Sequence, residues 1–221
     1  VEMQHEIWDQ FEIEGDARAG LGMNPRMLLG TDPAFNEAML NPKVLALAEF
    51  TCGRGALAYQ TGGSLRLKGT PELFLHADHI ASIPPPFPAH NYIMTACWAL
   101  TDWSKDGGST MIVPGSNQHR RMPTQEESAA KEGAISFEAP AGSIALWDGS
   151  VWHGSWPQTE DRERVGLHMS YCRSALRTVE VYDHLGDDFV EEWGPQMGTL
   201  LKRDPGLLEG RTIEDMFPEL A

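Results

Sequence analysis

Short runs of apolar and β-branched residues begin after Gly53 and alternate with clusters of Gly, Pro, Asn and Asp. This spacing is typical of a β-sandwich or barrel, in which tight turns join short strands. The runs that we expect to form strands are residues 56–60, 64–68, 73–78, 92–100, 110–113, 135–138, 143–147, 151–154 and 164–172. The pattern therefore predicts a mainly β core over about residues 53–175.

The segments on either side of this core have a helical character. Residues 33–50 place apolar side chains at helical spacing, with Asp32 as a candidate N-cap, and predict one helix. After residue 172, apolar residues are scattered among Gly and Pro, which predicts short helices packed outside the β core. Because no repeat or low-complexity tract interrupts residues 1–221, we expect a single domain.

Two further segments are candidates for covering a pocket. The proline-rich stretch 84–88 is incompatible with a helix or a strand ladder, so we expect an extended loop that forms a pocket wall. This loop and the tail 183–221 are candidate lids, because loops on a rigid β scaffold commonly set specificity.

Composition excludes several classes of function. The 221 residues contain 17 Lys and Arg against 32 Asp and Glu, a net charge of −15. Such a surface repels phosphate backbones and anionic lipids, so we expect neither nucleic-acid nor membrane partners. It also disfavours a strongly anionic substrate, unless a local patch of positive charge intervenes. The three widely spaced cysteines, and the lack of a leader or of a membrane-length apolar run, predict a soluble, cytoplasmic protein.

The first chemical signal is the predicted strand that contains His76 and Asp78. Residues two apart on a strand point to the same face, so an imidazole and a carboxylate lie side by side there. This pair is half of a metal site. Taken alone, it is equally consistent with a solvated strand end.

The second signal is His153, which follows a predicted Asp-Gly turn and a bulky apolar pair. Two histidines and one carboxylate on one face of a metal leave three coordination positions open, as in non-haem Fe(II) oxygenases. The alternative is a core histidine that bonds a backbone carbonyl.

The third signal is Arg164, which opens an apolar strand on which residues 164, 166, 168 and 170 share a face. An arginine that leads into a barrel is costly to bury unless it meets an anion, and a dicarboxylate would satisfy it in a bidentate manner. The alternative is a surface ion pair in the charged run 160–164. Arg162 therefore competes with Arg164 for the role of anion ligand.

Together, five ordered motifs resemble the phytanoyl-CoA dioxygenase family of Fe(II)- and 2-oxoglutarate-dependent oxygenases, over roughly residues 50–175. They are His76-Ala77-Asp78, Trp98-Ala99-Leu100-Thr101-Asp102, the glycine-rich run from Gly107 through Val113-Pro114-Gly115-Ser116, His153-Gly154-Ser155, and Arg164 eleven residues beyond His153. The chain departs from the family pattern in having Asn117 where a histidine usually follows the Pro-Gly-Ser element, and fewer residues before His76.

The resemblance implies a double-stranded β-helix, a jelly-roll or cupin-like barrel with flanking α-helices. It also implies that His76, Asp78 and His153 bind Fe(II) and that Arg164 binds the distal carboxylate of 2-oxoglutarate. The implied reaction uses O2 to hydroxylate or otherwise oxidise a C–H bond of a small organic substrate, with succinate and CO2 as co-products. Asp78 leaves no vacancy for a halide, which favours hydroxylation over halogenation.

Two hydroxyl residues are further candidates for contact with the co-substrate. Thr95 lies on the predicted strand 92–100, where its hydroxyl is placed to donate to a carboxylate, and Ser170 shares the face of Arg164. Equally, both positions suit residues that only support the sheet.

Two other functions stay open from the sequence. One is a cupin-like metalloenzyme that holds Mn, Zn or Fe without 2-oxoglutarate, and an interior Arg164 argues against it. The other is a catalytically silent module that binds a small acid, for which an intact set of metal ligands is unnecessary. No motif specifies the substrate or the oligomeric state.

Overall fold

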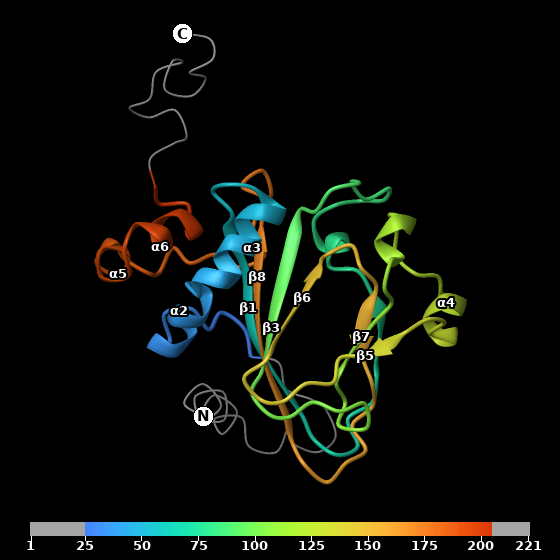
Figure 1. Cartoon of the computed structure of the whole chain (residues 1–221). Coiled ribbons are helices and arrows are strands. Elements are labelled where there is room, and N and C mark those ends of the chain that lie inside the picture. The colour runs from blue at the N-terminus through green and yellow to red at the C-terminus, as the bar shows by residue number, and fades with distance from the viewer. Residues whose placement is uncertain (1–24, 205–221) are drawn as a thin grey trace.

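The computed structural model describes residues 25–204, which form two facing antiparallel sheets and the helices around them (Figure 1). The first sheet has the strand order β1-β8-β3-β6 and the second the order β2-β7-β4-β5. The strands of the first sheet are β1 (Leu57–Arg66), β3 (Ile93–Ala99), β6 (Ile144–Asp148) and β8 (Arg164–Cys172), and those of the second are β2 (Leu73–His76), β4 (Thr110–Ile112), β5 (Ile135–Ser136) and β7 (His153–Ser155).

Strand β8 shows how the sequence divides the two faces of the first sheet. Its odd-numbered residues Val165, Leu167, Met169 and Tyr171 are fully buried in the main hydrophobic core. Its even-numbered residues face the second sheet instead, since side chains alternate along a strand. The sheet therefore has one apolar face for packing and one polar face for chemistry, as the predicted strand 164–172 implied.

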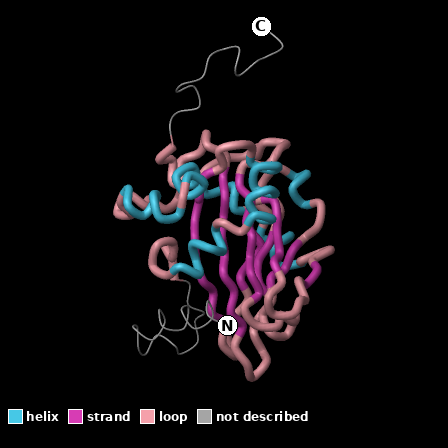
Figure 2. The backbone as a smooth tube through the Cα atoms, turned by 60° about the vertical axis from the view of Figure 1, so that its left-hand side comes forward, coloured by secondary structure: helices cyan, strands magenta, loops and turns pink. Residues whose placement is uncertain are grey.

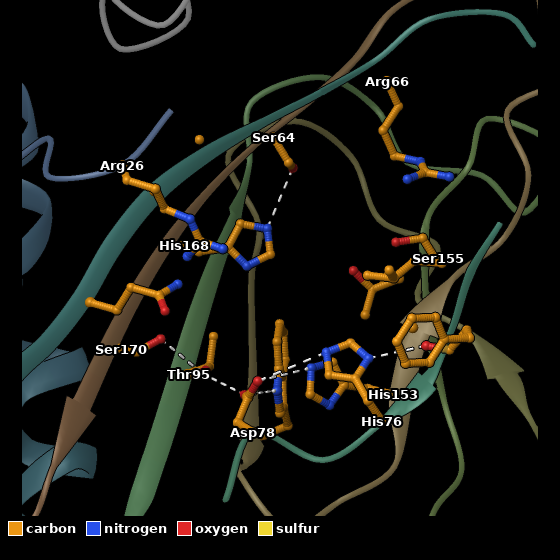
Figure 3. A pocket seen from close by; sticks show the side chains of 18 of the residues that line it. Arg26, Ser64, Arg66, His76, Asp78, Thr95, His153, Ser155, His168 and Ser170 are labelled. Atoms are coloured by element: carbon orange, nitrogen blue, oxygen red, sulfur yellow. Dashed lines mark hydrogen bonds and ion pairs between the residues drawn. The ribbon is translucent and has the colours of Figure 1, made fainter. Parts of the chain in front are cut away.

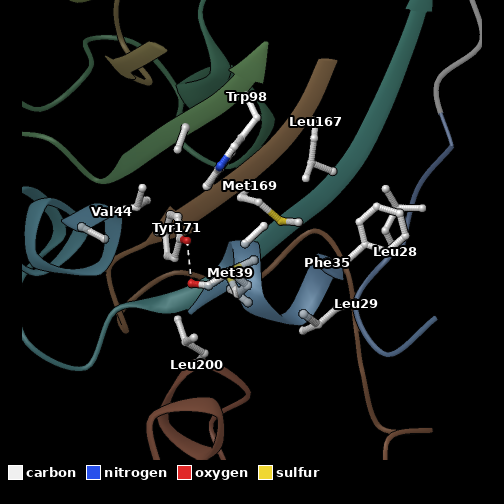
Figure 4. Close-up of a cluster of buried hydrophobic side chains, with 14 of the residues drawn as sticks. Leu28, Leu29, Phe35, Met39, Val44, Trp98, Leu167, Met169, Tyr171 and Leu200 are labelled. Carbon is white, nitrogen blue, oxygen red and sulfur yellow. Dashed lines mark hydrogen bonds between the residues drawn. The ribbon is translucent and has the colours of Figure 1, made fainter. Parts of the chain in front are cut away.

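Helices cover the apolar face of the first sheet (Figures 1 and 2). They are α2 (Pro33–Met39), α3 (Pro42–Cys52), α5 (Asp187–Trp193) and α6 (Pro195–Leu200). Phe35 and Met39 of α2 and Leu200 of α6 are buried against the sheet, and the Tyr171 hydroxyl donates to the Met39 carbonyl over 2.8 Å (Figure 4). Within residues 25–204, the remaining helical elements are the helix α4 (Gln125–Ala130) and two 3-10 turns, η2 (Asp78–Ala81) and η3 (Ser116–His119).

The predicted flanks are largely confirmed, with one correction. The segment 33–50 forms two helices rather than one, because Asn41 leaves the helical conformation before Pro42 and caps α3 through its side chain. Asp32 caps α2 as predicted and accepts from the amide of Ala34 over 2.8 Å. The short helices predicted after residue 172 are present to residue 200, and the remainder of the tail from residue 205 lies outside the described residues.

Three strand predictions also need correction. Residues 56–60 and 64–68 belong to one strand, β1, which continues through Gly62 and Gly63 because both pair with β8. Strand β2 ends at His76, so Asp78 lies on η2 and not on a strand. The predicted strand 151–154 begins two residues later, at His153.

The facing sheets and flanking helices confirm the predicted mainly β fold, although the two sheets do not join into a closed barrel among the described residues. No helix within residues 25–204 combines the length and apolar character needed to cross a membrane. The proline-rich loop 84–88 does not line the cavity between the sheets, so its predicted role as a pocket wall is wrong for the described cavity. Its Phe87 is instead fully buried.

Candidate active site

A cavity of about 470 Å³ opens between the polar faces of the two sheets (Figure 3). On the first sheet, its lining follows the strand register, since the neighbours Gln60 and Ser170, Gly62 and His168, and Arg66 and Arg164 all pair across β1 and β8. The second sheet contributes residues that include His76, Thr110, His153 and Ser155. These pairs lie at different positions along β1 and β8, so the strand alternation arranges the cavity lining in layers.

Three predicted metal ligands meet at one end of this cavity. His76 ends β2 and His153 begins β7, and these two residues are paired across the second sheet. Asp78 follows on η2, so that its Oδ1 lies 3.5 Å from His153 Nε2 and 4.0 Å from His76 Nε2. The ligand atoms of all three residues lie within 4.8 Å of one another. The pairing of β2 with β7 and the turn η2 therefore bring together the residues that the sequence selected.

The donor set fits a divalent metal ion. An ion held about 2.1 Å from each ligand needs ligand atoms roughly 3 to 4 Å apart, close to the observed separations. The Nδ1 atoms of His76 and His153 each donate to a backbone carbonyl over 3.0 Å, that of Phe74 and that of Val151. These bonds fix the tautomer and leave both Nε2 lone pairs free for a metal. The carbonyl bond expected of a structural core histidine therefore also directs the Nε2 atom of His153 toward Asp78.

Asp78 is oriented by two donors on its other carboxylate oxygen. Its Oδ2 accepts from the Thr95 hydroxyl over 3.1 Å and from the Trp147 indole over 3.3 Å. Burial raises the pKa of Asp78, but the imidazole of His153, then that of His76 and the Thr95 hydroxyl, outweigh it and hold the pKa well below its usual range. The carboxylate is therefore ionised, with Oδ1 directed at the histidines.

The hydroxyls of Thr95 and Ser170 contact each other over 3.0 Å. The structure thus joins both candidate co-substrate residues to the carboxylate of Asp78, because Thr95 donates to it. Their contact with 2-oxoglutarate stays a prediction. Trp147 is placed beside Asp78 by the register of Thr95 with Trp147 across β3 and β6.

Arg164 is buried in the same cavity, with 2% of its surface exposed. Its Nη1 donates to the Ser64 hydroxyl over 2.8 Å and its Nη2 to the Thr110 hydroxyl over 3.1 Å, while its guanidinium stacks on Trp103 at 3.8 Å. Its Nε is buried and has no hydrogen-bond partner among the described residues. Burial lowers the pKa of Arg164 to about 10, with a smaller effect from Arg66, so it remains charged at neutral pH.

A second buried arginine, Arg66, lies beside Arg164 in the β1–β8 register. It donates to the carbonyls of Pro71 and Trp156, and its Nε also lacks a partner within residues 25–204. No described acidic residue forms an ion pair with either guanidinium. Two buried cations without a protein counter-ion favour an anionic ligand at this end of the cavity, because an isolated buried charge is costly.

The competing arginine, Arg162, lies on the surface. It pairs with Glu160 and donates to the Ser104 hydroxyl over 2.7 Å. It does not line the cavity. The surface ion pair considered for the charged run 160–164 therefore exists, but it is made by Arg162 rather than by Arg164.

Three cavity residues, Ser64, Arg66 and Ser155, were not predicted from the sequence. The missing signal was the alternation on β1, where Gln60, Gly62, Ser64 and Arg66 all face the cavity. Treating residues 56–68 as two strands concealed this period of two. Ser155 belongs to the His153-Gly154-Ser155 motif, and it pairs with Thr110 across β7 and β4.

Gly154 is required by the close approach of two strands beside the metal ligands. A Cβ at this position would lie 2.4 Å from the carbonyl oxygen of Leu73 and 2.9 Å from that of Phe74. Only glycine lets β2 and β7 approach closely enough to bring His76 and His153 together. The glycine of the His-Gly-Ser motif therefore has a structural reason.

A model of the phytanoyl-CoA dioxygenase family matches residues 27–166, which is more than half of the chain. The chain belongs to the phytanoyl-CoA dioxygenase family. Membership confirms the resemblance stated from the sequence. The match includes both predicted histidine ligands, Asp78 and Arg164.

Curated relatives include a protein named as a dioxygenase and an uncharacterized protein. The chain is 28% identical over 172 residues to the dioxygenase af480 of Aspergillus fumigatus, an alignment that covers 77% of this chain and 55% of that protein. It is 26% identical over 196 residues to the uncharacterized protein Rv1501 of Mycobacterium tuberculosis, with 86% and 70% covered. The chain thus spans little more than half the length of the Aspergillus relative.

Solved structures show the same fold. The epimerase SnoN, in complex with Fe3+, alpha-ketoglutarate and nogalamycin RO, is 18% identical with a TM-score of 0.64, over 80% of this chain and 75% of that one. HygX from Streptomyces hygroscopicus, with nickel and 2-oxoglutarate bound, is 15% identical with a TM-score of 0.65, over 85% and 83%. These likenesses confirm the predicted double-stranded β-helix.

Proposed function

We propose that this chain is the catalytic domain of an Fe(II)- and 2-oxoglutarate-dependent dioxygenase that hydroxylates, or otherwise oxidises, a C–H bond of a small organic substrate. The observation that carries the proposal is one cavity with a His-Asp-His cluster at one end and the buried Arg164 at the other. Family membership supports the same activity.

The charge and position of each cavity residue determine its proposed role. His76, Asp78 and His153 hold the iron, and Arg164 pairs with the distal carboxylate of 2-oxoglutarate. When bound, Fe(II) supplies the redox chemistry by which O2 oxidises a substrate C–H bond while 2-oxoglutarate is converted to succinate and CO2. The protein contributes position, since the two sheets place the His-Asp-His cluster and Arg164 in one cavity.

The hydroxyl pair behind Asp78 has a supporting role in this proposal. Thr95 donates to Oδ2 and is itself bonded to Ser170, so the carboxylate presents Oδ1 to the metal. With both imidazoles neutral at Nε2, the three ligands carry one negative charge. A divalent ion on them keeps a net positive charge, which favours chelation of an anionic keto acid.

The cupin-like alternative, a metal site without 2-oxoglutarate, gives no role to Arg164. Its guanidinium is buried among Ser64, Thr110 and Trp103, and none of these is an anion. A silent acid-binding module would explain the arginine but not the alignment of both histidine Nε2 atoms with Asp78. The oxygenase accounts for both ends of the cavity.

The test is Fe(II)-dependent formation of succinate from 2-oxoglutarate with consumption of O2, in wild-type protein and in His153→Ala. We expect slow turnover in wild type even without a primary substrate, and none in the variant. Iron bound at one equivalent with no succinate formed, either alone or with candidate substrates, would favour the cupin-like function instead. We further propose a cytoplasmic location, which suits the three free, buried cysteines.

A further inference from the structure

The cavity contains a third arginine that the proposed chemistry does not use. Arg26 precedes α2, and its backbone forms an antiparallel bridge with Gly62 at the outer edge of β1. Its side chain crosses the strand above Gly62, where a Cβ would lie 3.4 Å from Arg26 Cδ and 3.7 Å from Nη1. The glycine therefore leaves the space through which this arginine reaches the cavity.

Arg26 lies at a different place in the cavity from the other two arginines. Figure 3 shows it beside His168 and apart from Arg66. His168 pairs with Gly62 across β1 and β8, four residues closer than Arg66 to the layer of Thr95 and Ser170. Arg26 thus faces the middle of the cavity, between the metal ligands and the co-substrate end.

The described cavity carries an excess of positive charge, and Arg26, unlike the buried Arg66 and Arg164, is exposed and can meet an incoming ligand. Its described lining contains three arginines and one aspartate, Asp78, which leaves two positive charges when the histidines are neutral. A divalent iron ion and the 2-oxoglutarate dianion cancel each other, so the excess persists in the loaded enzyme. A positive cavity in a protein of net charge −15 attracts anions selectively.

An apolar rim lies beside the metal ligands. Leu73, Phe74 and Ile80 line the cavity although they are 41%, 62% and 45% exposed. The Phe74 ring is 5.7 Å from that of His76. Exposed apolar side chains at a pocket mouth are suited to the apolar body of a ligand.

We propose that Arg26 binds an acidic group of the primary substrate, which is an organic acid with an apolar body that lies against Phe74 and Ile80. The proposal rests on the proposed function, because it assigns the substrate of that same site. It reverses the expectation, drawn from overall charge, of a substrate that is not strongly anionic. Arg26 selects the acid, and the rim places its carbon chain beside the metal ligands.

The experiment compares hexanoate with hexanamide, which have the same shape and differ in charge. Their dissociation constants are measured by saturation-transfer NMR on protein loaded with Zn(II) and saturating 2-oxoglutarate, which occupies the Arg164 end. We expect wild type to bind the acid at least about tenfold more tightly than the amide, as a charged contact implies. Arg26→Gln should abolish this preference and Arg26→Lys should retain part of it. Arg162→Gln, which removes a surface arginine, is the matched control and should behave as wild type.

Equal binding of acid and amide by wild type, or no binding of either, overturns the proposal. A preference that survives Arg26→Gln, or that is lost in Arg162→Gln, overturns it as well. The same preparations, given Fe(II) and 2-oxoglutarate without oxygen, report separately on the proposed function. A keto-acid charge-transfer band without a preference for the acid would support the proposed oxygenase and contradict the proposed role of Arg26. If the band is missing, the oxygenase fails, and the comparison of Arg26→Gln with wild type still decides the acid site.

Discussion

Replacing Arg164 with Gln removes the buried charge and keeps a polar side chain near the Ser64 and Thr110 hydroxyls that Arg164 contacts. A hydrogen bond to a charged group contributes about 1.5–3 kcal/mol. If the guanidinium holds the distal carboxylate of 2-oxoglutarate, its loss should cost about 3 kcal/mol, or about a 100-fold rise in the dissociation constant. The metal ligands at the other end of the cavity are untouched, so iron should still bind.

The effect is measured as stabilisation by ligand in a thermal melt of the metal-loaded protein without oxygen. At a 2-oxoglutarate concentration of 100 times the wild-type dissociation constant, the ligand stabilises wild type by about 2.7 kcal/mol. The variant, with a 100-fold weaker site, gains only about 0.4 kcal/mol. For a chain of this size, these values correspond to a rise in Tm of roughly 5–10 °C against about 1 °C.

The control is Arg162→Gln, which alters a surface arginine paired with Glu160. It should show the full wild-type rise in Tm. An equal rise in Arg164→Gln and wild type would refute the assignment of Arg164. Loss of the rise in Arg162→Gln alone would show that the anion is bound at the surface arginine.

Three further outcomes are expected. His76→Ala and His153→Ala should each abolish stoichiometric Fe(II) binding, and near-normal iron content in either variant would remove that residue from the ligand set. Thr95→Val removes the hydroxyl that donates to Asp78 Oδ2. It should weaken Fe(II) binding about tenfold and leave the circular dichroism spectrum unchanged, because a bond that orients a ligand is lost. An unchanged Fe(II) affinity would contradict this role of Thr95. Burial lowers the pKa of His168 from about 6.5 to about 3, so below pH 6.5 the unfolded chain takes up a proton that the folded protein excludes, and stability falls as the pH falls. His168→Gln should therefore lose less stability between pH 6 and pH 4 than wild type, by up to about 1.4 kcal/mol per pH unit in urea unfolding, and parallel curves would contradict this.

The parts of the fold that could be predicted from the sequence are those set by local pattern. The strand 164–172 has the bounds of β8, because its apolar and polar residues alternate without interruption. The predictions failed where a tertiary contact overrides the local signal. Gly62 and Gly63 indicated a break, but pairing with β8 carries β1 through them. Asn41 and Pro42 split a helix whose apolar spacing continues across them.

In the candidate site, too, local motifs could be predicted from the sequence and tertiary contacts could not. The candidate ligands His76, Asp78 and His153 were predicted from motif order, even though the strand geometry assumed for Asp78 was wrong, since it lies on η2. Their meeting depends on the pairing of β2 with β7, which no local pattern specifies. Arg26 lies 50 residues before His76 in the chain, and only its bridge to the edge of β1 brings it to the cavity.

The proposed function requires that one cavity holds both iron and 2-oxoglutarate. The most direct test is an anaerobic ultraviolet-visible titration of the protein with Fe(II) and then with 2-oxoglutarate. The account predicts a weak metal-to-ligand charge-transfer band that saturates at one equivalent of each and is absent in His153→Ala. Iron bound at one equivalent with no such band at saturating 2-oxoglutarate would contradict it.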